Sequence, residues 1–268
     1  MINFNREYWE NRGKRKYYYR GEDFYTITPI PYYYQRRNVL LNLLENEISE
    51  YREQTHEITV LDFGCGDGFY SVYTRELLSN SSVWGYDVAH SMILRAKKKR
   101  GSAHKRKITF STKLPIHKKF DIVYIFSVFA HLTDKQIKYV LDILPNLLNH
   151  SGKILLFEAT GNESFKGKNW FRRTEQDYIE LFQKNNLKLL NKNIIVFPFY
   201  NKCRYRFIKP IAKLFFSSDI LRANNSVLFL WINEFLLFLS RFLDKFFTDH
   251  DGNTFFVFNK NFEIQRQK

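Results

Sequence analysis

Two acidic residues flank a glycine-rich segment in the first third of the chain. Asp62 ends an apolar run and is followed by glycines at alternate positions, Gly64, Gly66 and Gly68. A second acid, Asp87, ends another apolar run about 20 residues beyond the glycines. Glycines let the backbone approach a ligand closely, and carboxylates accept hydrogen bonds from hydroxyl or ammonium groups. The pattern therefore predicts a nucleotide-cofactor site where two strands end.

The glycine spacing differs from that of a dinucleotide site. The segment from Asp62 to Gly68 reads D-x-G-x-G-x-G, whereas a dinucleotide fingerprint reads G-x-G-x-x-G. A carboxylate is unfavourable beside a pyrophosphate but acceptable beside a cationic cofactor that carries an amino acid. The segment resembles motif I of the class I S-adenosylmethionine-dependent methyltransferases. The resemblance implies that S-adenosylmethionine is the cofactor, that Asp62 lies near its methionyl amino group, and that Asp87 binds the ribose hydroxyls.

The resemblance also implies which positions surround the cofactor. The expected cofactor-binding residues are Asp62, Gly64, Cys65, Gly66, Gly68, Asp87, Val88, Ser111, Thr112 and Ser127. One position departs from the family, because many relatives place an aspartate for the adenine amino group where this chain has Ser111 and Thr112. The contact to adenine is therefore left open.

Strands and helices alternate along most of the chain. Besides the strand at 58–63, strands are expected at 83–87, 108–110, 120–127, 153–158, 187–197 and 254–258, with helices at 31–54, 69–79, 90–99, 134–148 and 174–184. This order predicts an α/β fold with a seven-stranded, mostly parallel sheet and helices on both faces. The resemblance implies that the last strand is antiparallel, between the fifth and the sixth. In such sheets ligands bind beyond the carboxyl ends of the parallel strands.

Three regions are expected around this sheet. Residues 1–54 form an N-terminal arm and cap helix, 55–199 and 252–268 form the Rossmann-like cofactor-binding domain, and 200–251 form a helical insertion. Long insertions of this kind are usually lids or binding loops, so a substrate cap is expected, with a dimer contact or membrane apposition as alternatives. The apolar stretch at 227–247 is interrupted by Asn233 and Glu234, so it is not expected to span a membrane. These two residues are expected to share a polar helix face that carries both acids and bases.

The chain carries a formal net charge of +15, which favours anionic partners. The densest basic run, 95–107, joins a helix to the third strand and is therefore expected at the amino edge of the sheet, either as a solvated helix end or as a polyanion contact. A second aromatic and basic group follows the fifth strand, on the ligand side. The expected substrate-binding residues are Trp170, Arg172 and Arg173 from this group and Tyr25 from the N-terminal arm.

Methyl transfer to a hydroxyl requires alignment of the acceptor and removal of its proton. His131 follows the fourth strand and Glu158 ends the fifth, so these two residues are the candidate bases. The segment at 126–131 is not the Asn/Asp-Pro-Pro-Tyr/Phe motif of enzymes that methylate base amino groups, and it holds no cysteine for pyrimidine C5 methylation. With two cysteines in the chain, a disulfide framework and a cysteine-based zinc site are not expected, and no metal is predicted.

The leading hypothesis is an O-methyltransferase for an anionic small-molecule or glycan-linked acceptor. Such an acceptor is a phosphorylated sugar, a nucleotide sugar or an intermediate of surface-polysaccharide biosynthesis. An RNA methyltransferase and a catalytically inactive cofactor-binding scaffold are the alternatives. The N-terminus has no apolar core of signal-peptide length. A cytoplasmic protein is therefore expected, with peripheral contact at the inner membrane surface as a variant, and the oligomeric state is left open.

Overall fold

The computed structural model describes residues 5–14, 17–19, 22–24, 30–102, 106–167, 170–208, 210–211, 226–248 and 251–260. The chain divides into two compact units, which are described separately. Unit 1 comprises Met1–Lys14, Glu45–Ile194 and Asn253–Lys268, and unit 2 comprises Arg15–Leu44 and Ile195–Gly252.

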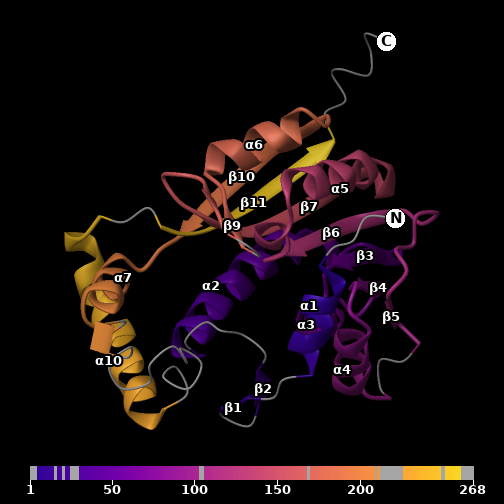
Figure 1. Ribbon diagram of the computed structural model, residues 1–268. Helices are drawn as coiled ribbons and strands as arrows, with labels where there is room; N and C mark the ends of the chain where they lie inside the picture. The colour runs from indigo at the N-terminus through magenta and orange to yellow at the C-terminus, as the bar shows by residue number, and fades with distance from the viewer. Residues whose placement is uncertain are drawn as a thin grey trace. The chain divides into compact units, whose positions relative to one another are not determined.

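Unit 1 is built on a seven-stranded sheet. Its strands are β3 (Ile58–Phe63), β4 (Ser81–Tyr86), β5 (Ile108–Ser111), β6 (Phe120–Phe126), β7 (Leu148–Thr160), β10 (Leu187–Ile195) and β11 (Gly252–Lys260). The order across the sheet is β10-β11-β7-β6-β3-β4-β5, with parallel pairing from β7 to β5. The last strand lies between β7 and β10, and the arrows in Figure 1 show that it runs opposite to β10. The predicted fold class is confirmed.

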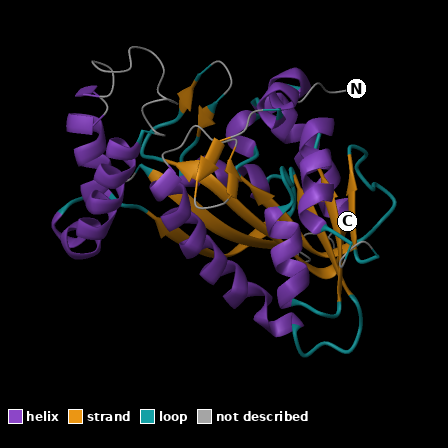
Figure 2. Ribbon diagram, turned by 90° about the horizontal axis from the view of Figure 1, so that it is seen from below, coloured by secondary structure: helices purple, strands orange, loops and turns teal. Residues whose placement is uncertain are grey.

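Helices cover both faces of this sheet (Figures 1 and 2). The helices of unit 1 are α3 (Phe69–Leu77), α4 (His90–Arg100), α5 (Asp134–Leu147) and α6 (Glu175–Gln183). Figure 1 shows α5 and α6 on one face and α3 and α4 on the other. Apolar side chains of β3, β6 and β7 pack against α5 and α6 in a fully buried core. Both of these helices begin with a capping box, at Thr133 and at Thr174, which satisfies backbone N–H groups in the first turn.

A short helix, α1 (Arg6–Gly13), packs against α4. The Glu10 carboxylate accepts hydrogen bonds from the backbone N–H groups of His90 (2.6 Å) and Ser91 (2.9 Å), which are free of intrahelical partners in the first turn of α4. A Cβ atom on Gly13 would lie 2.3 Å from Oγ of Ser91, so only glycine allows this approach. The sequence analysis placed these residues in an N-terminal arm and did not predict this helix, which is held by tertiary contacts.

Unit 2 contains the remaining elements. These are β1 (Tyr17–Tyr19), β2 (Glu22–Phe24), α2 (Ile30–Ile48, which continues into unit 1 as the 3₁₀ turn Ser49–Tyr51), α7 (Pro198–Cys203), the π-helical turn Arg204–Ile208, α10 (Val227–Leu243) and the 3₁₀ turn Asp244–Phe246. Helix α10 packs mainly against α7. Among the described residues, no helix is long and apolar enough to cross a membrane.

Two local expectations are corrected or refined by the sheet. The expected helix at 134–148 and strand at 153–158 left residues 149–152 between them, but these residues lie inside β7, where the pairing with β6 skips from Leu148 to Lys153. The end of the basic run, at Lys107, lies at the amino edge of the parallel strands, as predicted, and Lys107 pairs there with Glu57 at 2.5 Å. The part of the run within α4 lies beside the glycine turn instead, because Lys99 pairs with Asp67 of that turn at 2.5 Å.

Candidate functional site

The glycine turn joins β3 to α3 at the carboxyl edge of the sheet. Asp62, near the end of β3, is buried, and its Oδ2 accepts a hydrogen bond of 2.6 Å from the Ser71 hydroxyl of α3. The backbone N–H groups of Gly64 and Cys65 donate to the carbonyl of Tyr86 at the end of β4, at 2.7 and 2.9 Å. These bonds fix the turn against the neighbouring strand, so the two strand ends form one site.

Asp87 closes the site from the second strand. Its Oδ2 accepts from the backbone N–H of Gly66 (3.0 Å), and its Oδ1 accepts from that of Ala89 (2.9 Å). Each carboxylate oxygen has a second lone pair for a further donor. Asp87 therefore holds the glycine turn, and its two oxygens can each accept one hydroxyl of a vicinal diol.

Glycine is required in this turn for two separate reasons. Gly64, Gly66 and Gly68 all have positive φ, at 80°, 53° and 77°. A Cβ atom on Gly64 would also lie 2.4 Å from Cγ2 of Val128, which follows β6. The turn is thus confined to a backbone path that a residue with a side chain could follow only with strain. Cys65 is buried within it.

Burial makes the acidic groups of the site easy to protonate. It raises the pKa of Asp62 to about 7, although the hydrogen bond from Ser71 favours the charged form. It raises the pKa of Asp87 to about 6, against the two backbone N–H groups that favour the carboxylate. A cationic or hydroxyl-bearing ligand would compensate for this loss of solvent, so the two buried acids suit the cofactor that the sequence implies.

Glu158 holds the loop after β6. Its side chain is fully buried, and its carboxylate accepts hydrogen bonds from the backbone N–H groups of Val128 (2.7 Å), Phe129 (2.6 Å) and Ala130 (3.0 Å). Burial raises its pKa to about 7, although these three donors favour the carboxylate. Because both oxygens face backbone donors, the geometry supports a positioning role for Glu158 rather than contact with an acceptor.

His131 ends the 3₁₀ turn Phe129–His131 that Glu158 holds. Its half-buried ring meets Trp9 of α1 edge to face, with ring centroids 4.8 Å apart. Helix α1 therefore reaches the ligand edge of the sheet within unit 1. Of the two candidate bases, His131 is the one whose ring contacts a side chain at this edge.

The expected substrate residues separate into two groups. Arg173 is buried, and its guanidinium donates to the carbonyls of Phe129 (3.0 Å) and Leu132 (2.9 Å) and to Oδ1 of Asp134 (2.7 Å). It therefore braces the same loop as Glu158, from the other side. Trp170 is 39% exposed, in the small hairpin formed by β8 (Phe165–Lys166) and β9 (Phe171–Arg172).

Arg172 lies in the same hairpin, where its Nε donates to the Glu163 carbonyl at 3.3 Å. The hairpin thus presents an aromatic ring and a half-buried guanidinium just beyond the carboxyl end of β7. Tyr25 lies outside the described residues.

The remaining expected cofactor residues line the edge of the site at β4, β5 and β6. Val88 and Ser111 are half-buried, Thr112 is exposed, and the Ser111 hydroxyl accepts from the backbone N–H of Lys113 at 2.9 Å. Ser127, at the end of β6, has φ of 57°, an uncommon conformation for a residue with a side chain and one that often marks functional sites. No acid follows β5, so the adenine contact remains unassigned.

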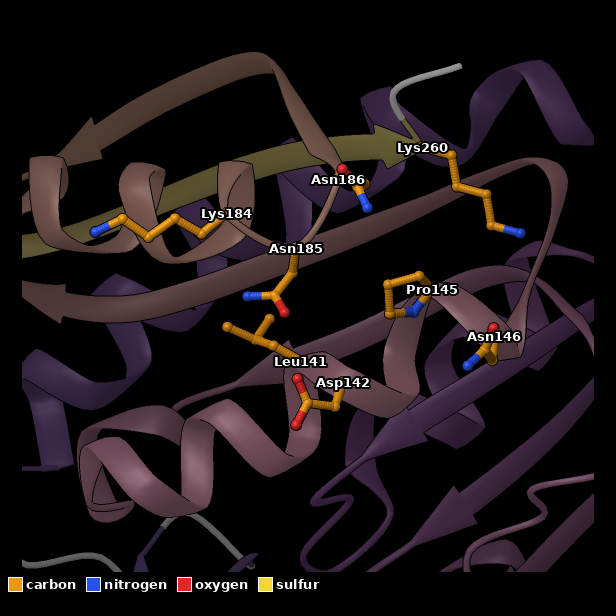
Figure 3. A pocket seen from close by; sticks show the side chains of 8 residues that line it. All are labelled: Leu141, Asp142, Pro145, Asn146, Lys184, Asn185, Asn186 and Lys260. Atoms are coloured by element: carbon orange, nitrogen blue, oxygen red, sulfur yellow. The ribbon is translucent and has the colours of Figure 1, made fainter. Parts of the chain in front are cut away.

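A pocket of about 350 Å³ lies elsewhere in unit 1 (Figure 3). It is lined by the C-terminal half of α5, the residues after α6 and the end of β11, including Asp142, Lys184 and Lys260. These segments lead into strands or end the antiparallel strand, so the pocket belongs to the amino edge of the sheet. It is separate from the site formed by Asp62, Asp87 and His131.

Three residues of the site were not predicted from the sequence. Ser71 bonds Asp62, Glu10 caps α4 beside Asp87, and Trp9 packs on His131. Ser71 falls on the inner face of α3, one helical turn past the glycines. This position could have identified it as a partner of Asp62 from the sequence. Glu10 and Trp9 contact residues about 80 and 120 positions away in the chain, and such contacts leave no local pattern.

Comparison with known proteins gives a consistent result. Residues 61–154 match the family described as methyltransferase domain. Over 133 residues the chain is 29% identical to a malonyl-[acyl-carrier protein] O-methyltransferase of Bacillus cereus, which covers 47% of this chain and 45% of the relative. Over 141 residues it is 32% identical to a mitochondrial ubiquinone biosynthesis O-methyltransferase of Candida albicans, which covers 48% of this chain and 41% of the relative. The chain thus spans less than half of the length of these curated relatives.

A solved structure is similar over a larger part of the chain. It is the O-methyltransferase from a trans-AT PKS multienzyme of Brevibacillus brevis in complex with S-adenosyl-L-homocysteine. The TM-score is 0.54 at 16% identity, over 87% of this chain and 77% of that one. The similarity at this level of identity is one of fold, and it extends well beyond the segment that the sequence matches cover.

Proposed function

We propose that the chain is a class I S-adenosylmethionine-dependent methyltransferase, which binds S-adenosylmethionine and transfers its methyl group to an acceptor oxygen; the match of residues 61–154 to a methyltransferase domain and the shared fold support this proposal. The observation that best supports cofactor binding is the pair of buried acids on either side of the glycine turn, Asp62 and Asp87. The O-methyltransferases among its relatives support oxygen as the accepting atom.

Cofactor binding is assigned to three groups. Asp87 accepts the ribose hydroxyls with the oxygens that also hold Gly66 and Ala89. Asp62, oriented by Ser71, favours the cationic methionyl end. The left-handed glycine turn provides a backbone surface without side chains. When bound, S-adenosylmethionine supplies an electrophilic methyl group on a sulfonium.

The chain's own part in the reaction is alignment and proton removal. We assign the general base to His131, because histidine titrates near neutral pH and this ring lies at the ligand edge. The imidazole would take the proton of the acceptor hydroxyl as that oxygen accepts the methyl group that the bound cofactor would supply. Glu158 and Arg173 hold the backbone of 128–132 from two sides, so they position His131 rather than react.

For the acceptor we propose an anionic small molecule or a glycan-linked intermediate, such as a phosphorylated or nucleotide-linked sugar. The net charge of +15 and the Trp170–Arg172 hairpin beyond β7 support this class. Arginine suits phosphate oxygens, and an exposed indole suits stacking on a sugar or a base. A role for 200–251 as a substrate cap stays a prediction.

The test is transfer of labelled methyl groups by the purified chain to a panel of phosphorylated sugars, nucleotide sugars and bulk RNA. We expect product with a member of the first two classes. Transfer to RNA alone would replace the acceptor class, and bound cofactor without any product would favour the inactive scaffold.

A separate variant tests whether His131 is the general base. His131→Gln is expected to lower kcat by roughly 10²–10⁴-fold, the usual contribution of a general base, with little change in cofactor affinity. His117→Gln, at an exposed histidine of the loop between β5 and β6, is the matched control. Equal turnover of the two variants would remove His131 from the chemistry.

A further inference from the structure

Helix α10 turns its most apolar face toward solvent. Six large apolar side chains recur along one side of α10 and the turn that follows it, and each is between 53% and 71% exposed. They are Leu228, Trp231, Phe235, Phe238, Phe242 and Phe246. Spacings of three and four residues place them in one stripe, here called the aromatic stripe. Scattered apolar residues are ordinary on a protein surface, but a continuous stripe usually marks a contact site.

Three polar residues of α10 and the turn after it lie away from the aromatic stripe. The Asn233 amide oxygen accepts from the Tyr200 hydroxyl (2.6 Å), and its Nδ2 donates to the Phe229 carbonyl (2.5 Å). Ser240 is buried as well, and Asp244 accepts from the backbone N–H of Phe199 at 2.8 Å. Asn233, expected on a polar helix face, and Asp244 thus bond inward to α7.

Cations lie at the C-terminal end of the aromatic stripe. Arg241 is exposed, and the ammonium of Lys245 is 5.0 Å from the Phe246 ring centroid. The ammonium of Lys202, from α7, is 5.1 Å from the Phe247 ring centroid. Residues 195–252 as a whole carry eight lysines and arginines against five acids. An exposed aromatic face bordered by cations is complementary to a surface with an apolar interior and negative head groups.

We propose that the aromatic stripe docks on an anionic lipid bilayer, with α10 lying in the plane of the interface. Trp and Phe side chains favour the boundary between head groups and acyl chains, and flanking cations are attracted to anionic lipids. At 17 residues α10 is suited to lie on a bilayer rather than cross it. The inference does not depend on methyl transfer, since it concerns a surface of unit 2 alone.

Vesicle co-sedimentation tests the proposal with the full chain. We expect at least tenfold stronger partitioning to vesicles of phosphatidylcholine with about 30% phosphatidylglycerol than to phosphatidylcholine alone, with most of the difference lost in about 0.5 M salt. Phe235→Ser with Phe238→Ser should lower partitioning at least tenfold. The control is Leu94→Ser with Ile116→Ser, two residues of unit 1 that are 54% and 56% exposed, and it should leave partitioning unchanged.

Two further measurements separate the possible outcomes. Brominated lipids should quench the fluorescence of the wild-type protein, and Trp231→Phe should remove most of that quenching even if the double serine variant does not fold. Light scattering gives the oligomeric state of each variant. Equal partitioning of the two double variants, quenching that survives Trp231→Phe, or a wild-type dimer that serine substitutions dissociate in the absence of vesicle binding would each overturn the proposal.

Discussion

Replacing Asp87 by asparagine separates the two tasks of this carboxylate. Its oxygens accept from the N–H groups of Gly66 and Ala89, at 3.0 and 2.9 Å. An asparagine of the same shape has one acceptor oxygen, so its NH₂ group must face one of these backbone donors. An unpaired buried donor costs about 1–3 kcal/mol. Asp87→Asn is therefore expected to lower the free energy of unfolding by that amount, offset by the removal of a buried charge.

Asp87→Asn is expected to affect cofactor binding more than it affects the free energy of unfolding. A ribose would lose one of two hydrogen bonds to a carboxylate, each worth about 1.5–3 kcal/mol. We expect the Kd for S-adenosylmethionine to rise by about 10- to 150-fold, since 1.36 kcal/mol corresponds to a factor of ten. Isothermal titration calorimetry measures this directly. Asp142→Asn, which removes one charge from an exposed aspartate at the amino edge, is the matched control.

The pH dependence gives the same variant a second readout. Burial raises the pKa of Asp87 to about 6, so its charged form is complete at pH 8 and is lost as the pH falls through 6. Wild-type affinity should then fall by about tenfold from pH 8 to pH 5, and more if protonation of Asp62 contributes. The variant should have a shallower pH profile. An unchanged Kd in Asp87→Asn, or profiles of equal slope, would refute the assignment of the ribose to Asp87.

Three other predictions concern the stability of the site. Glu158→Gln places an amide NH₂ against one of three backbone N–H groups and should cost about 1–3 kcal/mol in urea unfolding; unchanged stability would contradict the positioning role. Gly64→Ala should destabilise by at least about 1 kcal/mol, and adding Val128→Ala should recover only the part due to the 2.4 Å contact; full recovery would mean that the positive φ costs nothing. The folded pKa of Asp62, about 7, exceeds its unfolded value, so its contribution to stability is full below pH ~4 and is lost as the pH rises through 7. Asp62→Asn should therefore raise the Tm of the cofactor-free protein at pH 8 more than at pH 5, and a gain that is the same at both pH values would exclude this linkage.

Most of the sheet could be predicted because its signals are local. Apolar runs, glycine turns and capping residues place β3, β4 and α5 within a few residues of their observed ends. The seven-stranded order with β11 between β7 and β10 followed from the resemblance. Spacing placed Asp62 and Asp87 at the ends of neighbouring strands, where the structure has them, and their cofactor roles stay predictions from the resemblance.

The remaining features depend on contacts between distant segments. Glu158 was predicted as a candidate base, and its sequence neighbours do not reveal that its carboxylate accepts hydrogen bonds from the three backbone N–H groups of 128–130. Arg173 was read as a substrate ligand, yet it donates to carbonyls of the same loop. The polar face of α10 was predicted without a direction, because hydropathy does not indicate that Tyr200 and Phe199 bond Asn233 and Asp244 inward.

The most direct test of the central claim is the electron density of the protein crystallised with S-adenosylhomocysteine. We expect the ligand at the glycine turn between β3 and β4, with both ribose hydroxyls on the Asp87 carboxylate and the sulfur facing the loop that carries His131. Density for the ligand at any other place, or calorimetry with no heat of binding at a concentration that saturates related enzymes, would contradict the account.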